Sequence, residues 1–158
     1  MTAATQPILV LFVDDIVETV TYQRNTVRDS CQVTTHLCRS INQAVRFIQR
    51  RRHEILAVVI DLYMPGDYGL LRDYERTIPG GLKMNQGQLL GAYLRDPGKP
   101  GFGLEYRYLT AVSEVMSDAT EDENNRKISK DVREINNLIA FIDSCKQGDG
   151  TTSRRGGL

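Results

Sequence analysis

Five side chains in this sequence of 158 residues are of types that could together perform phosphoryl chemistry: Asp14, Asp15, Asp61, Thr110 and Lys130. Carboxylates that lie close together repel one another and raise each other's pKa values. A divalent cation such as Mg²⁺, which prefers oxygen ligands, removes that repulsion. One carboxylate can then act as a nucleophile toward phosphorus, while the hydroxyl and the ammonium bind and neutralise the transferring group. This chemistry requires a fold that brings the five together.

Apolar runs predict the strands that would position these side chains. Residues 8–13 and 55–62 are continuous and rich in β-branched side chains, as is typical of strands covered on both faces. Weaker strands are predicted at 32–37, 106–112 and 126–130. The acidic pair follows the first of these strands, and Asp61, Thr110 and Lys130 lie near the ends of three others.

Helical patterns fill the spaces between these strands. The first helix is predicted from about 16 to 28, with Ile16, Val20 and Val27 facing inward. Ser40 and Gln43 have the spacing of a capping box, and Ile41, Ala44, Val45 and Ile48 form the apolar face of the helix that follows.

Three more helices are predicted after residue 62. One spans roughly 85–95, and the acidic stretch 113–125 is expected to be a poor or exposed helix. The last helix is expected to begin at the cap residue Asp131, with Glu134 as its capping-box partner. Its apolar face is formed by Ile135, Leu138, Ile139 and Ile142.

Strands that alternate with helices predict an α/β fold, a doubly wound parallel sheet with helices on both faces. Ligands in such folds bind outside the carboxyl ends of the strands. Those ends carry Asp14, Asp15, Asp61, Thr110 and Lys130, so all five are expected at one edge of the sheet. A lone aspartate after a strand is usually a turn residue, but four strand ends with matching chemistry are far less expected by chance.

Bulk composition excludes several classes of function. Lys plus Arg and Asp plus Glu number 20 each, so the basic excess typical of direct nucleic-acid binding is absent. No apolar run approaches the roughly 20 residues that span a membrane, and the apolar run 8–13 ends in two aspartates, unlike a signal peptide. The three cysteines, Cys31, Cys38 and Cys145, favour a reducing, cytoplasmic setting.

These motifs resemble the receiver domain of two-component response regulators. The residues that carry the resemblance are the pair Asp14-Asp15, the run Asp61-Leu62-Tyr63-Met64-Pro65-Gly66, the pair Thr110-Ala111, and Lys130. The resemblance implies a flavodoxin-like, five-stranded parallel sheet of order 2-1-3-4-5. The receiver domain is expected over residues 1–147, and residues 148–158, which lack apolar periodicity, are expected to form a flexible tail.

The resemblance further implies a role for each site residue. Asp61 would be the phosphoacceptor, and Mg²⁺ would bind Asp14, Asp15, Asp61 and the backbone carbonyl of Tyr63. Thr110 would be the switch hydroxyl and Lys130 the phosphate partner. The donor would be a histidine kinase or a histidine phosphotransfer protein, with a downstream protein, or a second copy of the chain, as the output partner. Self-phosphorylation and autodephosphorylation are then expected, without conventional enzymatic turnover.

The sequence departs from the family pattern at its last strand. The family lysine usually precedes a proline, whereas Lys130 precedes Asp131, and Lys127 is a rival for the role. Lys130 is favoured because Asp131 then opens the last helix. An aromatic side chain usually lies three residues before this lysine, at the position of Lys127. We therefore expect altered signalling through the surface formed by the last strand and its flanking helices.

The second departure is the spacing between Asp61 and Thr110, which exceeds the family spacing by roughly 20 residues. An insertion over about 66–85 is expected, with Gly87-Gln88-Leu89-Leu90 resuming the family's third helix. The rival placement begins that helix at Gly69. The inserted segment is either a tolerated surface insertion or a lid or partner-docking element beside Asp61.

Two other function classes are compatible with parts of the sequence. A pseudo-receiver that binds or dimerises without accepting phosphate would fit the change at Lys127 and the insertion. An aspartate-nucleophile phosphatase normally has a second aspartate two residues after its nucleophile. Tyr63 occupies that position, which argues against a phosphatase.

Overall fold

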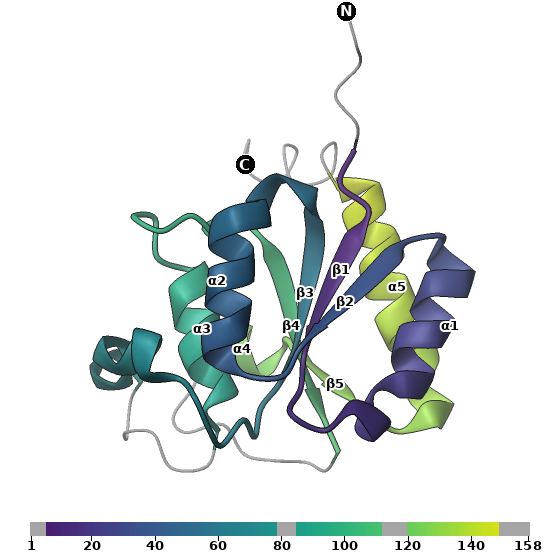
Figure 1. Cartoon of the computed structure of the whole chain (residues 1–158). Helices are drawn as coiled ribbons and strands as arrows, with labels where there is room; N and C mark the ends of the chain where they lie inside the picture. The colour runs from purple at the N-terminus through teal and green to yellow at the C-terminus, as the bar shows by residue number, and fades with distance from the viewer. Residues whose placement is uncertain (1–5, 79–84, 112–119, 149–158) are drawn as a thin grey trace, which may run out of the picture.

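The computed structural model describes residues 6–78, 85–111 and 120–148, which form a five-stranded parallel sheet flanked by helices (Figure 1). The strand order is β2-β1-β3-β4-β5, which confirms the predicted topology. The strands are β1 (Leu9–Val13), β2 (Thr34–Cys38), β3 (Ile55–Asp61), β4 (Glu105–Thr110) and β5 (Lys127–Ser129).

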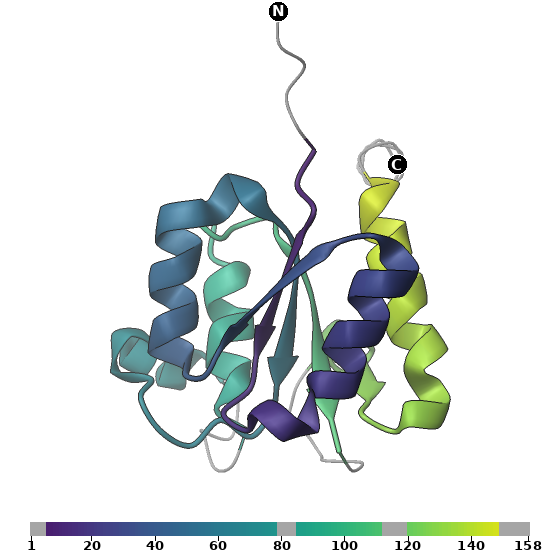
Figure 2. The ribbon, with the colours of Figure 1, turned by 45° about the vertical axis from the view of Figure 1, so that its right-hand side comes forward.

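The helices lie in two layers, one on each face of the sheet (Figures 1 and 2). They are α1 (Thr21–Cys31), α2 (Ile41–Arg51), α3 (Gly87–Leu94), α4 (Glu121–Asn124) and α5 (Ile135–Lys146). One apolar core joins the sheet to α2 and α3, and a second joins it to α1 and α5. Within the described ranges no helix is both long enough and apolar enough to cross a membrane.

β1, and β3 up to Asp61, are apolar because each face of these strands is covered. In β1, Leu9, Leu11 and Val13 enter the core beneath α2 and α3, whereas Val10 and Phe12 enter the opposite core. A parallel strand buried on both faces has no polar face to present, so its sequence shows no alternation. This burial is the reason that the run 8–13 is recognisable from sequence alone.

The predicted cap of α2 is present. The Ser40 hydroxyl accepts a hydrogen bond from the Gln43 amide at 3.1 Å, which satisfies one of the unpaired donors of the first turn. The Gln43 side chain accepts from the Arg39 amide at 2.8 Å, one residue before the position that a standard capping box uses. The helix therefore begins where the sequence indicates.

The first predicted helix begins later than expected. Residues Val17–Thr19 form a 3₁₀ turn, and Ile16, which was predicted to face inward, is 49% exposed. The cause is Asp14, whose carboxylate accepts hydrogen bonds from the Ile16 amide and the Thr19 hydroxyl. This turn holds residues 14–19 outside the helical path, so α1 begins only at Thr21.

The start of α5 and the environment of α4 also differ from expectation. Asp131 accepts from the Arg133 amide and precedes a 3₁₀ turn, Val132–Glu134, so the α-helix itself begins at Ile135. Of the stretch 113–125, predicted as a poor or exposed helix, residues 113–119 lie outside the described residues. The described part contains the four-residue α4, whose Glu121 and Asp122 are exposed as expected, whereas its Glu123 is only 6% exposed.

Glu123 is buried because four neighbouring side chains satisfy its carboxylate. It accepts hydrogen bonds from the hydroxyls of Tyr106 and Tyr108, and it forms ion pairs with Arg95 and Arg126. Burial, followed by the hydrogen bond to Glu123, raises the pKa of Tyr106 to about 12, so its hydroxyl remains a donor at neutral pH. The two tyrosines lie on one face of β4, and their hydrogen bonds to Glu123 join that strand to α4.

The described part of the predicted insertion packs against the domain. Residues Gly69–Thr77 form consecutive 3₁₀ turns beside α2 and α3 (Figure 1), and both Leu71 and Ile78 are buried in the adjoining core. The Tyr74 hydroxyl donates a hydrogen bond to Asp96 just beyond α3. Residues 79–84 lie outside the described chain, so the choice between a lid and a tolerated insertion stays untested.

Gly87 marks the point at which the chain returns to the sheet and α3 begins. Its amide donates to the carbonyl of Leu62 at 2.8 Å, directly after the strand that ends in Asp61. A Cβ atom at residue 87 would lie 2.3 Å from the Asp61 carbonyl oxygen. This close backbone approach requires glycine, and it matches the expectation that helix three resumes at Gly87 and not at Gly69.

We expect Gly87→Ala to lower the free energy of unfolding by about 1–3 kcal/mol, because the added methyl group must displace backbone atoms of β3. Gly69→Ala is the matched control, since a Cβ there meets nothing within 4 Å, and its effect should stay within about 0.5 kcal/mol. Chemical denaturation of the two variants measures the difference. Equal effects would contradict the close approach of α3 to β3.

Candidate functional site

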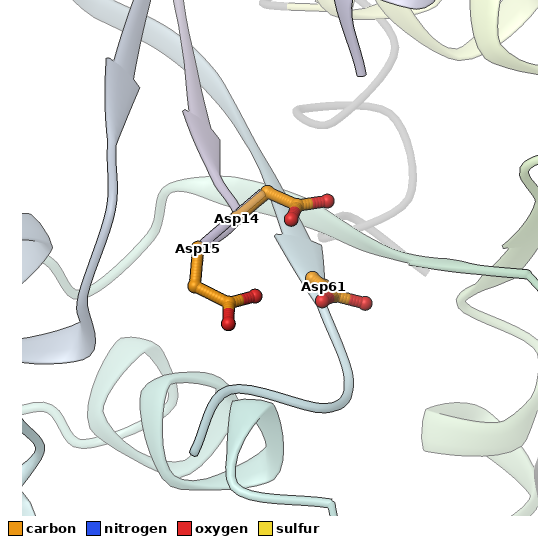
Figure 3. A group of neighbouring side chains, drawn as sticks. All are labelled: Asp14, Asp15 and Asp61. Atoms are coloured by element: carbon orange, nitrogen blue, oxygen red, sulfur yellow. The ribbon is translucent and has the colours of Figure 1, made fainter. Parts of the chain in front are cut away.

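Three carboxylates gather where two neighbouring strands end. Asp14 and Asp15 follow β1, and Asp61 is the last residue of β3 (Figure 3). The parallel register pairs Val13 with Ile60, so both strands reach the same edge of the sheet together. One oxygen from each of the three carboxylates lies within 4.8 Å of the others. The structure therefore forms the acidic cluster that the sequence predicts.

Asp14 is the most buried member of the cluster and supports several neighbours. One of its oxygens accepts from the Ile16 amide at 2.9 Å. The other accepts from the Thr19 hydroxyl at 3.0 Å and from the Lys130 ammonium at 2.8 Å. Asp14 thus fixes the turn that follows β1 and anchors Lys130.

Asp15 and Asp61 retain more of their capacity to bind a ligand. The Oδ1 atom of Asp15 is buried and finds no hydrogen-bond partner within the described part of the chain. The Asp61 side chain is 12% exposed, and its Oδ1 lies 3.4 Å from the Lys130 ammonium. A buried carboxylate oxygen without a donor is costly unless a cation or water reaches it.

Lys130 is the lysine that the structure places in the cluster. Its backbone amide donates to the Thr110 carbonyl at 2.7 Å, and its own carbonyl accepts from the Gln23 side chain at 2.8 Å. These bonds fix the chain just after β5 and direct the ammonium toward Asp14 and Asp61. The rival Lys127 lies three residues earlier, where the register pairs it with Tyr108.

Thr110 and Tyr63 lie near the cluster, but their predicted roles stay untested. The register pairs Asp61 with Leu109, so Thr110, a buried residue, lies one position further along the same edge of the sheet. Tyr63 is two residues beyond Asp61, and its side chain is 42% exposed. An outward side chain is compatible with a predicted ligand role for the Tyr63 carbonyl, because that role uses only the backbone.

The pKa of Asp61 reflects the burial and the charges around the cluster. Burial raises the pKa of its carboxyl to about 7, Lys130 opposes that shift, and the charges of Asp14 and Asp15 add to it. Burial is the largest of these effects, and the attraction of Lys130 does not fully offset it. A hard divalent cation fits this donor set, because Mg²⁺ binds carboxylate oxygens and keeps several waters.

Comparison with solved structures identifies the fold. The chain superposes on the receiver protein of a response regulator from Pseudoalteromonas atlantica with a TM-score of 0.60, at 14% identity, covering 89% of this chain and 98% of the other. The receiver domain of the Francisella response regulator 1452 gives 0.58 at 18% identity, with coverages of 89% and 98%. The bacteriophytochrome response regulator AtBRR gives 0.58 at 17%, with coverages of 90% and 94%.

The fold is that of a response-regulator receiver domain. No family model and no curated protein matches the sequence. At these identities the likeness to solved receivers establishes the architecture, so the chemistry must be argued from the cluster itself.

Sequence reasoning missed two residues that shape the site of this receiver fold. The Thr19 hydroxyl donates a hydrogen bond to Asp14. The side-chain amide of Gln23, on α1, donates a hydrogen bond to the carbonyl of Lys130, which is distant in the sequence. Gln23 is a buried polar residue on the inward face of α1, only 4% exposed. A glutamine between the apolar positions Val20 and Val27 was a signal in the sequence, but its distant partner was not.

In metal-free buffer we expect Asp61→Asn to stabilise the fold by about 1–2 kcal/mol near pH 8, after allowance for solvent screening. The folded-state pKa is raised from 3.8 to about 7, so between these values the folded wild type binds more protons than the unfolded chain. The wild-type free energy of unfolding therefore falls as the pH rises through this window, whereas that of the variant does not.

Thermal unfolding in chelator at a series of pH values measures this difference. The stabilisation should disappear as the pH falls below about 3.8, where Asp61 is protonated in both the folded and the unfolded chain. A stability difference that does not vary with pH would show that the folded-state pKa of Asp61 is not raised.

Proposed function

We propose that this chain is a phosphoacceptor receiver of a two-component phosphorelay. It would take a phosphoryl group from the phosphohistidine of a histidine kinase or phosphotransfer protein onto Asp61. The observation that carries the proposal is the position of the Asp61 carboxylate, grouped with Asp14 and Asp15 and 3.4 Å from the Lys130 ammonium. This group lies at the carboxyl ends of parallel strands, where α/β folds bind ligands.

Mg²⁺ would be held by Asp14, Asp15, Asp61 and the Tyr63 carbonyl, and when bound it supplies positive charge that favours ionised carboxylates and the developing phosphoryl charge. The buried Asp15 Oδ1 and the close spacing of the three carboxylates support this assignment. These residues are hard oxygen donors, which suit Mg²⁺ better than a softer metal.

In the proposed reaction, a carboxylate oxygen of Asp61 forms the new bond to phosphorus. The phosphorus–nitrogen bond of phosphohistidine breaks, its electron pair stays on the imidazole, and the imidazole takes up a proton. Lys130, already paired with Asp14, offers its ammonium to the phosphoryl oxygens. Thr110 would donate its hydroxyl to another phosphoryl oxygen from the end of β4.

The output of this receiver is expected to differ from the family pattern. Lys127 stands in β5 where an aromatic side chain is usual, and it pairs with Tyr108, whose hydroxyl is bonded to Glu123 of α4. We propose a downstream protein partner in the cytoplasm, with no direct nucleic-acid contact. The balanced charge of the chain supports that expectation.

Incubation with Mg²⁺ and acetyl phosphate should add one phosphoryl group to the intact chain, visible by mass spectrometry. Asp61→Asn should abolish the gain, because an amide cannot form the acyl phosphate. Asp29→Asn, an exposed aspartate of α1, is the matched control and should be phosphorylated like the wild type. No gain in the wild type would instead favour the pseudo-receiver, a binding module that takes no phosphate.

A further inference from the structure

The segment that follows Asp61 is held at both ends before the rest of the insertion begins. At its start, the Leu62 carbonyl accepts from the Gly87 amide at 2.8 Å, and the side chains of Leu62 and Met64 are buried. At its end lie Gly66, with a φ of 141°, and Asp67. Between these anchors stands the backbone of Tyr63, whose carbonyl is the proposed metal ligand.

A single residue of α2 provides the second anchor. Asn42 is 5% exposed, and its backbone amide donates to the Asp67 carbonyl at 2.9 Å. Its side-chain amide donates to the Asp67 carboxylate at 2.5 Å, and its side-chain oxygen accepts from the Leu70 amide at 2.9 Å. Asn42 thus uses its backbone amide, its side-chain amide and its side-chain oxygen to bind residues 67 and 70.

The location of Asn42 on α2 strengthens this contact. It is the second residue after the cap Ser40, so its amide belongs to the first turn, where no carbonyl of the helix is available. The Asp67 carbonyl satisfies that amide, and the Asp67 carboxylate lies at the positive end of the helix dipole. The contact therefore joins the insertion to a rigid element of the domain.

We infer that Asn42 is a positioning residue for the metal site, holding the backbone of residues 62–67 so that the Tyr63 carbonyl can serve as a ligand. This inference rests on the proposed function and goes beyond it, because it gives the start of the insertion a role in cation binding. Groups that orient metal ligands without touching the metal typically change metal affinity by about 10–100-fold when they are removed.

Asn42→Asp gives a test in which two explanations predict opposite changes in Mg²⁺ affinity. The new carboxylate faces Asp67 and disrupts the anchor, so Mg²⁺ binding should weaken at least about tenfold. If Asn42 acted only through the general electrostatics of the region, an added negative charge would instead tighten Mg²⁺ binding. The measurement is a titration of the full chain with Mg²⁺ alone, followed by amide NMR shifts.

The reciprocal exchange provides the rescue. In Asn42→Asp/Asp67→Asn the aspartate can accept from both the Leu70 amide and the new amide of residue 67, and the net charge is unchanged. Mg²⁺ affinity should then return close to the wild-type value. If Asn42→Asp fails to fold, Asn42→Ala, which adds no repulsion, should weaken Mg²⁺ binding in the same direction.

Tyr74→Phe is the matched control, because it removes a different hydrogen bond of the predicted insertion, the one from the Tyr74 hydroxyl to Asp96, which does not involve residues 62–67. It should lower thermal stability and leave Mg²⁺ affinity unchanged. Wild-type affinity in Asn42→Asp, or equal losses of affinity in Asn42→Asp and Tyr74→Phe, would overturn the inference. Absence of Mg²⁺ binding to the wild type itself would instead overturn the proposed function.

Discussion

Mutual repulsion among Asp14, Asp15 and Asp61 is the constraint on which the rest of the site depends. The pairing of β1 with β3 brings the three carboxylates to one edge of the sheet, and burial deprives them of the water that would otherwise screen their charges. The cost is visible in Asp61, whose pKa burial raises to about 7. Lys130 supplies permanent positive charge beside the cluster, and in the proposed function a divalent cation would add to it.

The surrounding structure holds this unfavourable cluster in place with contacts that lie outside it. Gln23 fixes the backbone of Lys130 from α1, and the Gly87 amide fixes the carbonyl of Leu62 from the start of α3. Asn42, on α2, holds the start of the predicted insertion. The segments around Asp61 are thereby tied to helices on both faces of the sheet.

The sequence predicted structure correctly where the pattern is local, and its predictions were wrong where a polar side chain binds a partner outside that local pattern. The cap formed by Ser40 and the apolar strands were predicted because each depends on neighbouring residues. Ile16 was wrongly placed inside, because the carboxylate of Asp14 draws the chain into a turn before α1. Glu123 was expected on an exposed helix, yet two tyrosines and two arginines from other elements compensate its burial.

The sequence by itself determined the parallel α/β fold and the acidic residues at its strand ends. These features follow from the hydrophobic pattern of the strands and helices and from the positions of the aspartates along it. Only the tertiary structure decided that Lys130 and not Lys127 reaches Asp14 and Asp61, and that Asn42 anchors Asp67. Both contacts depend on strand register and on residues far apart in the chain. Spacing along the sequence does not fix the register, and a shift of one residue would turn every side chain of a strand to the other face.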